Sequence, residues 1–223
     1  DAGFAAPRSV DELARVLESQ PQALVLAGGT DVGLWVTKQL RELPFIVYLG
    51  EVAELRQILA QPDGLHIGAA VPLSEAVAAL VEAWPELREL AQRFASLPVC
   101  NSGTLCGNIA NGSPIGDSMP VLLALGATLE LRRGAQSRRL PLDQFYLGYR
   151  RTALEPGEFI VSVRVPARRR GQSLWAWKVS KRWDQDISAI CAAVWLEESA
   201  TGVTQARSEE HTSELQSRGL ISY

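Results

Sequence analysis

The first candidate binding segment is a glycine-rich turn at residues 24–33, LVLAGGTDVG. A short apolar run ends in Gly28 and Gly29, and Thr30 follows them ahead of a segment that begins like a helix. A turn without Cβ atoms lets backbone N–H groups approach a phosphate, and a threonine hydroxyl adds a donor. A plain turn between a strand and a helix uses two glycines as readily, and neither GxxxxGK[ST] nor GxGxxG occurs here. The segment alone leaves both interpretations open.

A second glycine-rich segment, NSGTLCGNIANGSPIGDSMP, spans residues 101–120. Its composition predicts an ordered, buried loop with no long helix or strand, and buried loops need partners for their amides. A polyanionic ligand would accept from several such amides at once. Asp117 is interpreted either as an acceptor for a ribose hydroxyl or as the N-cap of the next helix. Phe94 is either ordinary core or a contact for a flat ring system.

The third segment is KVSKRWDQDIS, residues 178–188. In an alternating strand Trp175, Trp177 and Val179 share one face, and Lys178 lies on the other. Lys178 is therefore either a cation for an anionic cofactor or a solvated lysine. Four charged residues after it indicate a surface turn with weak ion pairs: Lys181, Arg182, Asp184 and Asp186.

Side chains that carry most acid–base and metal chemistry are scarce. The chain has two histidines, His66 and His211, and three cysteines, Cys100, Cys106 and Cys191, without a CxxC pair. This argues against a disulfide framework or a zinc or iron–sulfur site. It also leaves almost no residues for a Ser-His-Asp triad or a two-histidine metal centre. An enzyme of this composition would depend on a cofactor.

The apolar pattern predicts helices early in the chain and strands late. A capping box of Ser9 and Glu12 starts the first helix. The predicted helices cover residues 9–19, 73–84, 86–95 and 117 or 118 to 125. The predicted strands cover residues 23–27, 45–49, 65–69, 127–132, 137–140, 158–165, 174–180 and 188–196. This order favours the α+β class over a doubly wound fold.

Length and charge narrow the class of protein further. The 223 residues, 47% of them hydrophobic, suffice for one large domain or one and a half. A net charge of −3 gives no general reason to bind nucleic acid or an anionic membrane. The longest apolar stretch, residues 187–196, is about half of the roughly 20 residues that a spanning helix needs. We expect a cytoplasmic protein with neither a nucleic acid nor a membrane as partner.

Together, residues 27–44, 102–120 and 178–189 closely resemble the FAD-binding portion of bacterial xanthine dehydrogenase small subunits. Those subunits belong to the flavoprotein family of the molybdenum hydroxylases. The likeness is almost continuous from residue 3 to about residue 200. It implies a two-subdomain FAD-binding α+β domain at residues 1–165 and the opening strands of a truncated second α+β domain at residues 166–206.

The resemblance also implies which residues contact FAD. The first diphosphate loop matches Leu26, Ala27, Gly28, Gly29, Thr30, Asp31 and Gly33. The second diphosphate and flavin loop matches Thr104, Leu105, Gly107 and Asn108, and Asp117 matches the acid that holds a ribose or ribityl hydroxyl. Phe94, Ile160 and Lys178 fall at further FAD-contact positions.

In that family FAD receives electrons from iron–sulfur centres, which substrate oxidation at molybdenum supplies, and passes a hydride to NAD+. The resemblance implies electron transfer through FAD in a purine-oxidising dehydrogenase. The implied partners are a molybdopterin-binding large subunit, an iron–sulfur domain ahead of residue 1, and NAD+. Two alternatives stay open: the flavoprotein of another molybdenum hydroxylase, of the carbon monoxide dehydrogenase type, and a nucleotide-binding scaffold module without redox activity.

Two cysteines depart from the family pattern. Cys106 stands where the family loop usually has glycine, and Cys100 where it usually has arginine. A Cβ at Cys106 is expected to crowd the diphosphate, or to strain the backbone if φ is positive there. FAD affinity is then expected to fall.

The two ends of the chain differ from the rest. Residue 1 is Asp and not Met, so we expect the sequence to begin inside a longer polypeptide. Residues 207–223 are small, polar and acidic, which predicts an unpacked tail. Within it RSEEHTSELQSR resembles a translated sequencing-library adapter and is then a non-native tail. Its ionisable side chains, His211, Glu209, Glu210 and Glu214, are expected to have no function.

Overall fold

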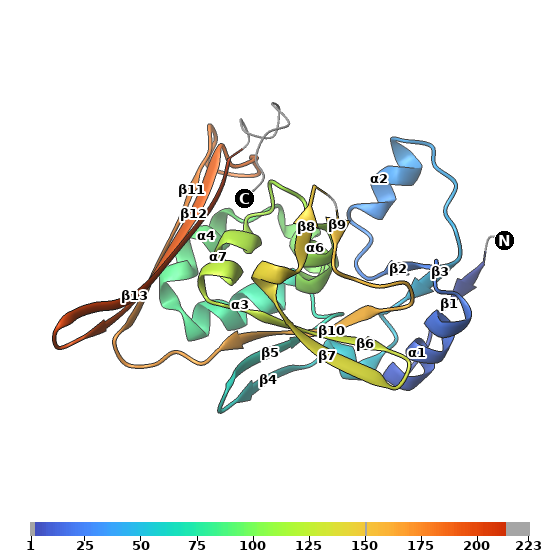
Figure 1. The fold of residues 1–223 in the computed structure, drawn as a ribbon. Coiled ribbons are helices and arrows are strands. Elements are labelled where there is room, and N and C mark those ends of the chain that lie inside the picture. Colours follow the sequence, from blue (N-terminus) through green and yellow to red (C-terminus); the bar gives the residue numbers. More distant parts are fainter. Residues whose placement is uncertain (1–2, 150, 213–223) are drawn as a thin grey trace.

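The N-terminal part of the chain folds around a small parallel sheet. A computed structural model describes residues 3–149 and 151–212. The sheet has the order β1–β3–β2, from β1 (Phe4–Ala5), β3 (Ile46–Tyr48) and β2 (Leu24–Leu26). Helix α1 (Val10–Ser19) follows β1, and the Ser9 hydroxyl accepts a hydrogen bond from the Glu12 amide at 3.2 Å, so the predicted cap is confirmed. Helix α2 (Val32–Thr37) has no buried residue and projects away from the other helices (Figure 1).

The second sheet forms one wall of the main core. Its five antiparallel strands have the order β4 (Ile58–Gln61), β5 (Gly64–Gly68), β10 (Phe159–Pro166), β6 (Thr128–Arg133) and β7 (Gln136–Pro141). Ile67, Leu129 and Val163 on its strands are fully buried. A short hairpin of β8 (Tyr146–Gly148) and β9 (Arg151–Thr152) follows β7.

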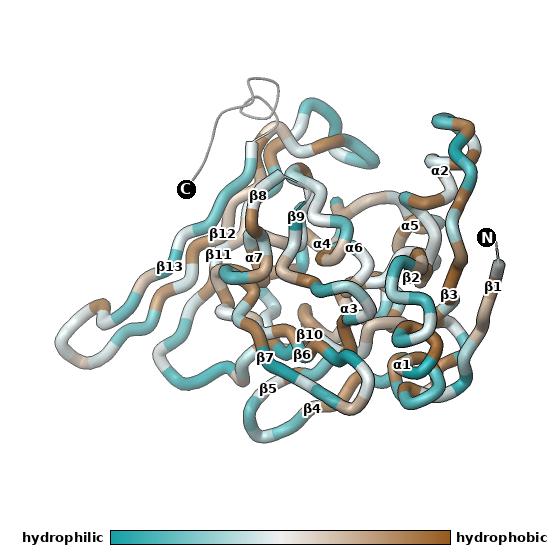
Figure 2. The backbone as a smooth tube through the Cα atoms, turned by 45° about the vertical axis from the view of Figure 1, so that its right-hand side comes forward, coloured by the Kyte–Doolittle hydropathy of each residue, from teal (hydrophilic) through white to brown (hydrophobic). Residues whose placement is uncertain are grey.

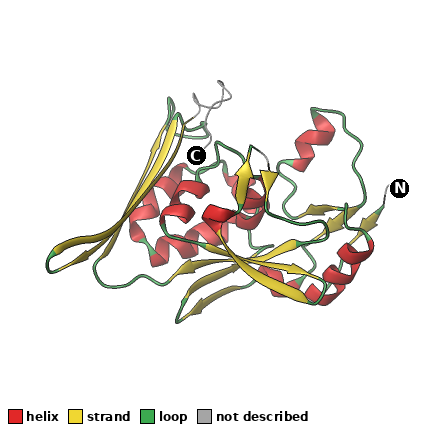
Figure 3. Cartoon of the chain, viewed as in Figure 1, coloured by secondary structure: helices red, strands yellow, loops and turns green. Residues whose placement is uncertain are grey.

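A group of helices covers one side of this sheet, and a third sheet lies at the far end of the group (Figure 3). The helices are α3 (Leu73–Ala83), α4 (Arg88–Arg93), α5 (Leu97–Ser102), α6 (Leu105–Asn111) and α7 (Ser118–Ala124). Single 3-10 turns lie at η1 (Ala53–Arg56), η2 (Pro85–Leu87) and η3 (Leu142–Gln144). No helix in the described ranges is long and apolar enough to cross a membrane.

The third sheet is antiparallel and has the order β11 (Gln172–Val179), β12 (Ile190–Ser199) and β13 (Gly202–Thr212). Its inner face contacts α7 and buries Leu174, Cys191 and Trp195. Its outer face leaves Trp175 and Trp177 43% and 50% exposed. Figure 2 shows the mostly hydrophilic β13 beside the more apolar β12.

The structure confirms the α+β class and corrects two local predictions. Residues 101–120 are not one irregular loop, because α6 and parts of α5 and α7 lie within them. Residues 207–212 are not an unpacked tail, since they form the second half of β13 and pair with β12 in register from Arg207 to Thr212. Residues 213–223, with Glu214, lie outside the described residues. The division at residues 165 and 166 stays a prediction, and it falls next to the end of β10 at Pro166.

Candidate functional site

A cavity of about 800 Å³ brings the three segments together. Its walls come from the β2–α2 turn, the ends of α4 to α6, β10, Lys178 and residues 185–188. This volume lies within the roughly 300–1,000 Å³ that is typical of cofactor sites. Of the residues predicted to contact FAD, the cavity is lined by Leu26, Ala27, Gly28, Gly29, Thr30, Asp31, Phe94, Thr104, Gly107, Asn108, Asp117, Ile160 and Lys178. Cys106, which was expected to crowd the diphosphate, also lines it. Gly33 and the fully buried Leu105 do not line it.

The first glycine-rich turn presents backbone to this cavity. A Cβ on Gly28 would lie 1.8 Å from the carbonyl oxygen of Ser102, so the turn is pressed against the backbone that leads into α6. Gly29 has a φ of +70°, a left-handed conformation that favours glycine. Within the described ranges, the backbone N–H groups of residues 28–31 have no hydrogen-bond acceptor. The turn is thus a short row of free donors.

The second segment reaches the cavity as the first turn of α6. Thr104 is the N-cap, and its hydroxyl accepts a hydrogen bond from the Gly107 amide at 3.0 Å. A Cβ on Gly107 would lie 2.7 Å from that hydroxyl oxygen. Behind this turn, the Asn108 side-chain oxygen accepts a 2.5 Å hydrogen bond from Ser118, which joins α6 to α7.

Cys106 does not have the strained backbone that the sequence suggested. It lies inside α6, and among the described residues other than glycine only Leu40, Ala95 and Gln185 have a positive φ. Its thiol is buried and points toward the Ile67 carbonyl oxygen of the five-stranded sheet, at 3.8 Å. Burial raises the pKa of this thiol to about 12, so the side chain is neutral. The expectation of strain at this position is wrong, because the residue is helical.

Asp117 is the centre of a buried polar network at the start of α7. Its carboxylate accepts hydrogen bonds from Lys178 at 2.6 Å, Ser188 at 2.6 Å and His211 at 2.9 Å. Burial raises the pKa of Asp117, but hydrogen bonds from His211, Lys178 and Ser188 outweigh it and hold the pKa at about 2. Asp117 does occupy the N-cap position of α7, but its side chain makes no cap hydrogen bond.

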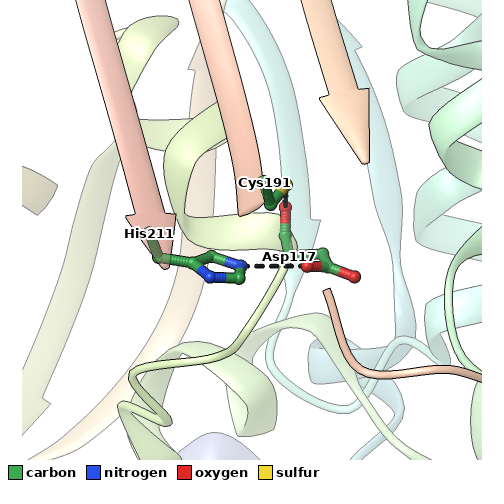
Figure 4. Close-up of side chains that lie close together, drawn as sticks. All are labelled: Asp117, Cys191 and His211. Atoms are coloured by element: carbon green, nitrogen blue, oxygen red, sulfur yellow. Dashed lines mark hydrogen bonds and ion pairs between the residues drawn. The ribbon is translucent and has the colours of Figure 1, made fainter. Parts of the chain in front are cut away.

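The expectation that His211 lies on an unpacked tail is also wrong. Its ring is 11% exposed and reaches Asp117 from β13 (Figure 4). Cys191, on β12, donates to the Asp117 backbone oxygen at 3.6 Å. The three candidate ligand atoms lie within 4.8 Å of one another. His211 and Cys191 already bond to Asp117, and the Asp117 carboxylate also holds the Lys178 ammonium. Burial raises the pKa of the Cys191 thiol, whereas metals bind thiolates. The cluster is a hydrogen-bond network.

The sequence matches a known family over most of its length. Residues 1–168 match the model described as FAD binding domain in molybdopterin dehydrogenase. The chain belongs to this family.

Relatives of this FAD-binding domain include the xanthine dehydrogenase of Emericella nidulans, 32% identical over 200 residues, and the mouse xanthine dehydrogenase/oxidase, 32% identical over 198. These matches cover 84% and 83% of this chain but only 15% of either relative. A solved carbon monoxide dehydrogenase of Hydrogenophaga pseudoflava has a TM-score of 0.85 at 29% identity, over 94% of this chain and 74% of that one. Quinoline 2-oxidoreductase from Pseudomonas putida 86 has a TM-score of 0.83 at 26% identity, over 95% of this chain and 74% of that one. The family enzymes named here are oxidoreductases.

In this FAD-binding domain, several residues that line the cavity were not singled out from the sequence. The Arg41 guanidinium stacks on the ring of Trp35 in α2, 4.4 Å from the ring centre, and Ala95 and Gln185 are the non-glycine residues of the wall with a left-handed φ. Ser188 lies inside a segment that the sequence did mark, but its bond to Asp117 spans 71 residues. Of these residues, only Trp35 could have been proposed from the sequence, because it is an aromatic residue soon after the glycine-rich turn.

Proposed function

We propose that the chain binds FAD in this cavity, with the diphosphate held by residues 26–31 and 104–108. The observation that carries the proposal is the row of free backbone N–H groups at residues 28–31, which line the same cavity as the first turn of α6. Oriented N–H groups without Cβ atoms between them are a typical anion site. Three glycines keep this surface open. A side chain at Gly28 would clash with the backbone of Ser102, and one at Gly107 would clash with the Thr104 hydroxyl. Gly29 has a left-handed φ, which strains any residue with a side chain.

The polar network supports an assignment for the sugar part of the ligand. A carboxylate has about four lone-pair sites, and the protein fills three of those on Asp117: two on Oδ1 and one on Oδ2. The remaining site on Oδ2 can accept from a ribose or ribityl hydroxyl. Lys178 lines the cavity and gives one of its three N–H donors to Asp117, so two donors remain for a ligand. Phe94 and Ile160 supply apolar surface for the rings.

We further propose that this domain works as the electron-transfer part of a xanthine dehydrogenase in the cytoplasm. FAD supplies the redox chemistry, taking electrons from iron–sulfur centres and passing a hydride to NAD+. Purine oxidation takes place at molybdenum in the large subunit. The 32% identity to xanthine dehydrogenases supports this choice. The TM-score of 0.85 to a carbon monoxide dehydrogenase favours that enzyme class as the second candidate.

The first test is a calorimetric titration of the purified full chain with FAD, FMN and ADP in turn. Because the glycine turn contacts the diphosphate, FAD should bind at one equivalent and far more tightly than FMN, and ADP should compete. Equal affinity for FAD and FMN would contradict the diphosphate assignment. Binding of ADP without any flavin would favour the scaffold alternative.

The second test addresses the acceptor. Bound FAD is reduced photochemically under anaerobic conditions, and NAD+ is then added. Reoxidation of the flavin with matching formation of NADH is expected, because a hydride passes from the reduced flavin to NAD+. A flavin that stays reduced with NAD+ but is reoxidised by a quinone would overturn the choice of acceptor while leaving FAD binding intact.

A further inference from the structure

Arg93, the last residue of α4, is a buried charge without a strong ionic partner in the described part of the chain. Its side chain is 9% exposed, and its nearest carboxylate, Glu89, lies 3.6 Å away and is itself 69% exposed. A buried guanidinium costs free energy unless its donors are used. Arg93 therefore owes its burial to something other than an ion pair.

The Arg93 donors all reach residues 178–188, the end of β11 and the segment that follows it. Nη1 donates to the Lys178 carbonyl oxygen at 2.5 Å, Nη2 to the Ser180 hydroxyl at 2.8 Å, and Nε to the Trp183 carbonyl oxygen at 3.4 Å. The guanidinium also stacks on the Trp183 ring, with its carbon 4.5 Å from the ring centre. One side chain thus holds three residues of this segment.

The two ends of the same segment meet at Asp117. Lys178 begins it and Ser188 ends it, and both side chains bond to the Asp117 carboxylate at 2.6 Å. Between them, residues 185–188 line the cavity, and Gln185 has a left-handed φ of 50°. Asp117 therefore links the two ends of this loop, and Arg93 holds its first end through the backbone of Lys178.

We infer that Arg93 is a positioning residue that acts through Lys178. It fixes the carbonyl of Lys178 and so sets where the ammonium enters the cavity. The inference rests on the proposed FAD site, because Lys178 is a ligand contact only there. Lysine cannot replace arginine in this role, since one ammonium lacks the planar fork that reaches the Lys178 carbonyl and the Ser180 hydroxyl together.

The test is a double-mutant cycle on the full chain, with the FAD dissociation constant and the spectrum of bound FAD as readouts. Arg93→Met keeps the buried stem and removes the donors, and Arg93→Lys tests the fork. Lys178→Gln keeps a donor near Asp117 but removes the ammonium. The matched control is Arg168→Met, because Arg168 also stacks on a tryptophan, Trp84 at 4.7 Å, and pairs with Glu86, yet does not line the cavity.

We expect Arg93→Met and Arg93→Lys each to raise the FAD dissociation constant about tenfold and to shift the flavin absorption band. Arg168→Met should leave both unchanged. In the Lys178→Gln background, Arg93→Met should add less than a twofold further loss, since the side chain through which it acts is gone.

Two outcomes would overturn the inference while the wild type still binds FAD. One is unchanged FAD affinity in Arg93→Met, and the other is an effect of full size in the Lys178→Gln background. If Arg93→Met does not fold, the double variant Ser180→Ala with Trp183→Leu removes two partners of Arg93 instead. The same cycle with Lys178→Gln then tests whether the effect on FAD affinity passes through Lys178. Failure of the wild-type chain to bind FAD would contradict the proposed function instead.

Discussion

Replacement of Gly28 by alanine tests the FAD site at its tightest point. The new Cβ would lie 1.8 Å from the Ser102 carbonyl oxygen and 2.6 Å from the Gly103 Cα atom, whereas ordinary contacts begin at 3.4 Å. The opposing backbone cannot retreat easily, because the Gly103 amide donates to Val99 and its carbonyl accepts from the Leu73 amide, at 2.7 and 2.8 Å. The two phosphate-binding segments must therefore separate by about 1.6 Å.

Overpacking of this kind costs about 1 to 3 kcal/mol. Because the new Cβ meets only backbone atoms, we expect about 2 to 3 kcal/mol here, which corresponds to a roughly 30- to 140-fold weaker FAD affinity. The same cost in stability would lower Tm by roughly 4 to 12 °C in a chain of this size. FAD titration and thermal melting of the ligand-free chain measure the two effects separately.

A graded glycine series provides the control. Gly29→Ala places its Cβ no closer than 3.7 Å to another atom but keeps a φ of +70°, so it should cost about 1 kcal/mol. Gly33→Ala meets no atom within 4 Å and lies in α2, so FAD affinity should not change. Wild-type affinity in Gly28→Ala, or an equal loss in Gly33→Ala, would refute the geometry of the two loops.

Three further predictions concern the network, the helix and the third sheet. The folded-state pKa of Asp117 is about 2, below its usual value of 3.8, so the ionised carboxylate adds about 2 kcal/mol to the free energy of unfolding above pH 4. This stability should be lost as the pH falls toward 2. Urea unfolding should show the loss in the wild type and not in Asp117→Asn. Cys106→Gly should destabilise the chain by about 1 to 2 kcal/mol by removing a buried helical side chain, and a rise in FAD affinity instead would restore the strain hypothesis. Trp175→Ser with Trp177→Ser should reduce self-association in light scattering without lowering Tm, whereas Trp195→Ser, 2% exposed, should unfold the chain; equal self-association in the double variant would exclude the outer face as its cause.

Local signals in the sequence predicted much of this fold. Ser9 and Glu12 marked the start of α1, and strand alternation put Lys178 on the face opposite Trp175 and Trp177, which the exposed fractions of 6% for Lys178 and 43% and 50% for the tryptophans confirm. Both depend on neighbours a few residues apart. The partner of Lys178 depends on tertiary structure, because Asp117 lies 61 residues away.

Two errors have physical causes of the same kind. Composition predicted that residues 207–212 would not pack, but backbone hydrogen bonds along the free edge of β12 do not depend on the side chains of the added strand. Cys106 was expected to be strained because glycine is usual there, yet its φ follows from the Thr104 N-cap and the helix that it starts. Neither the strand edge nor the helix register can be read from single residue types.

Strand β11 makes the cavity sensitive to chain length as well as to residue type. Trp177 and Lys178 are neighbours on opposite faces, and pairing of Lys178 with Cys191 on β12 sets which of them points inward. Insertion of one residue ahead of Trp177, with the preceding pairing kept, would reverse the two faces and present an indole, not an ammonium, to Asp117. Insertions and deletions of two residues would restore the alternation, so length variation within β11 should be tolerated in even steps and rejected in odd ones.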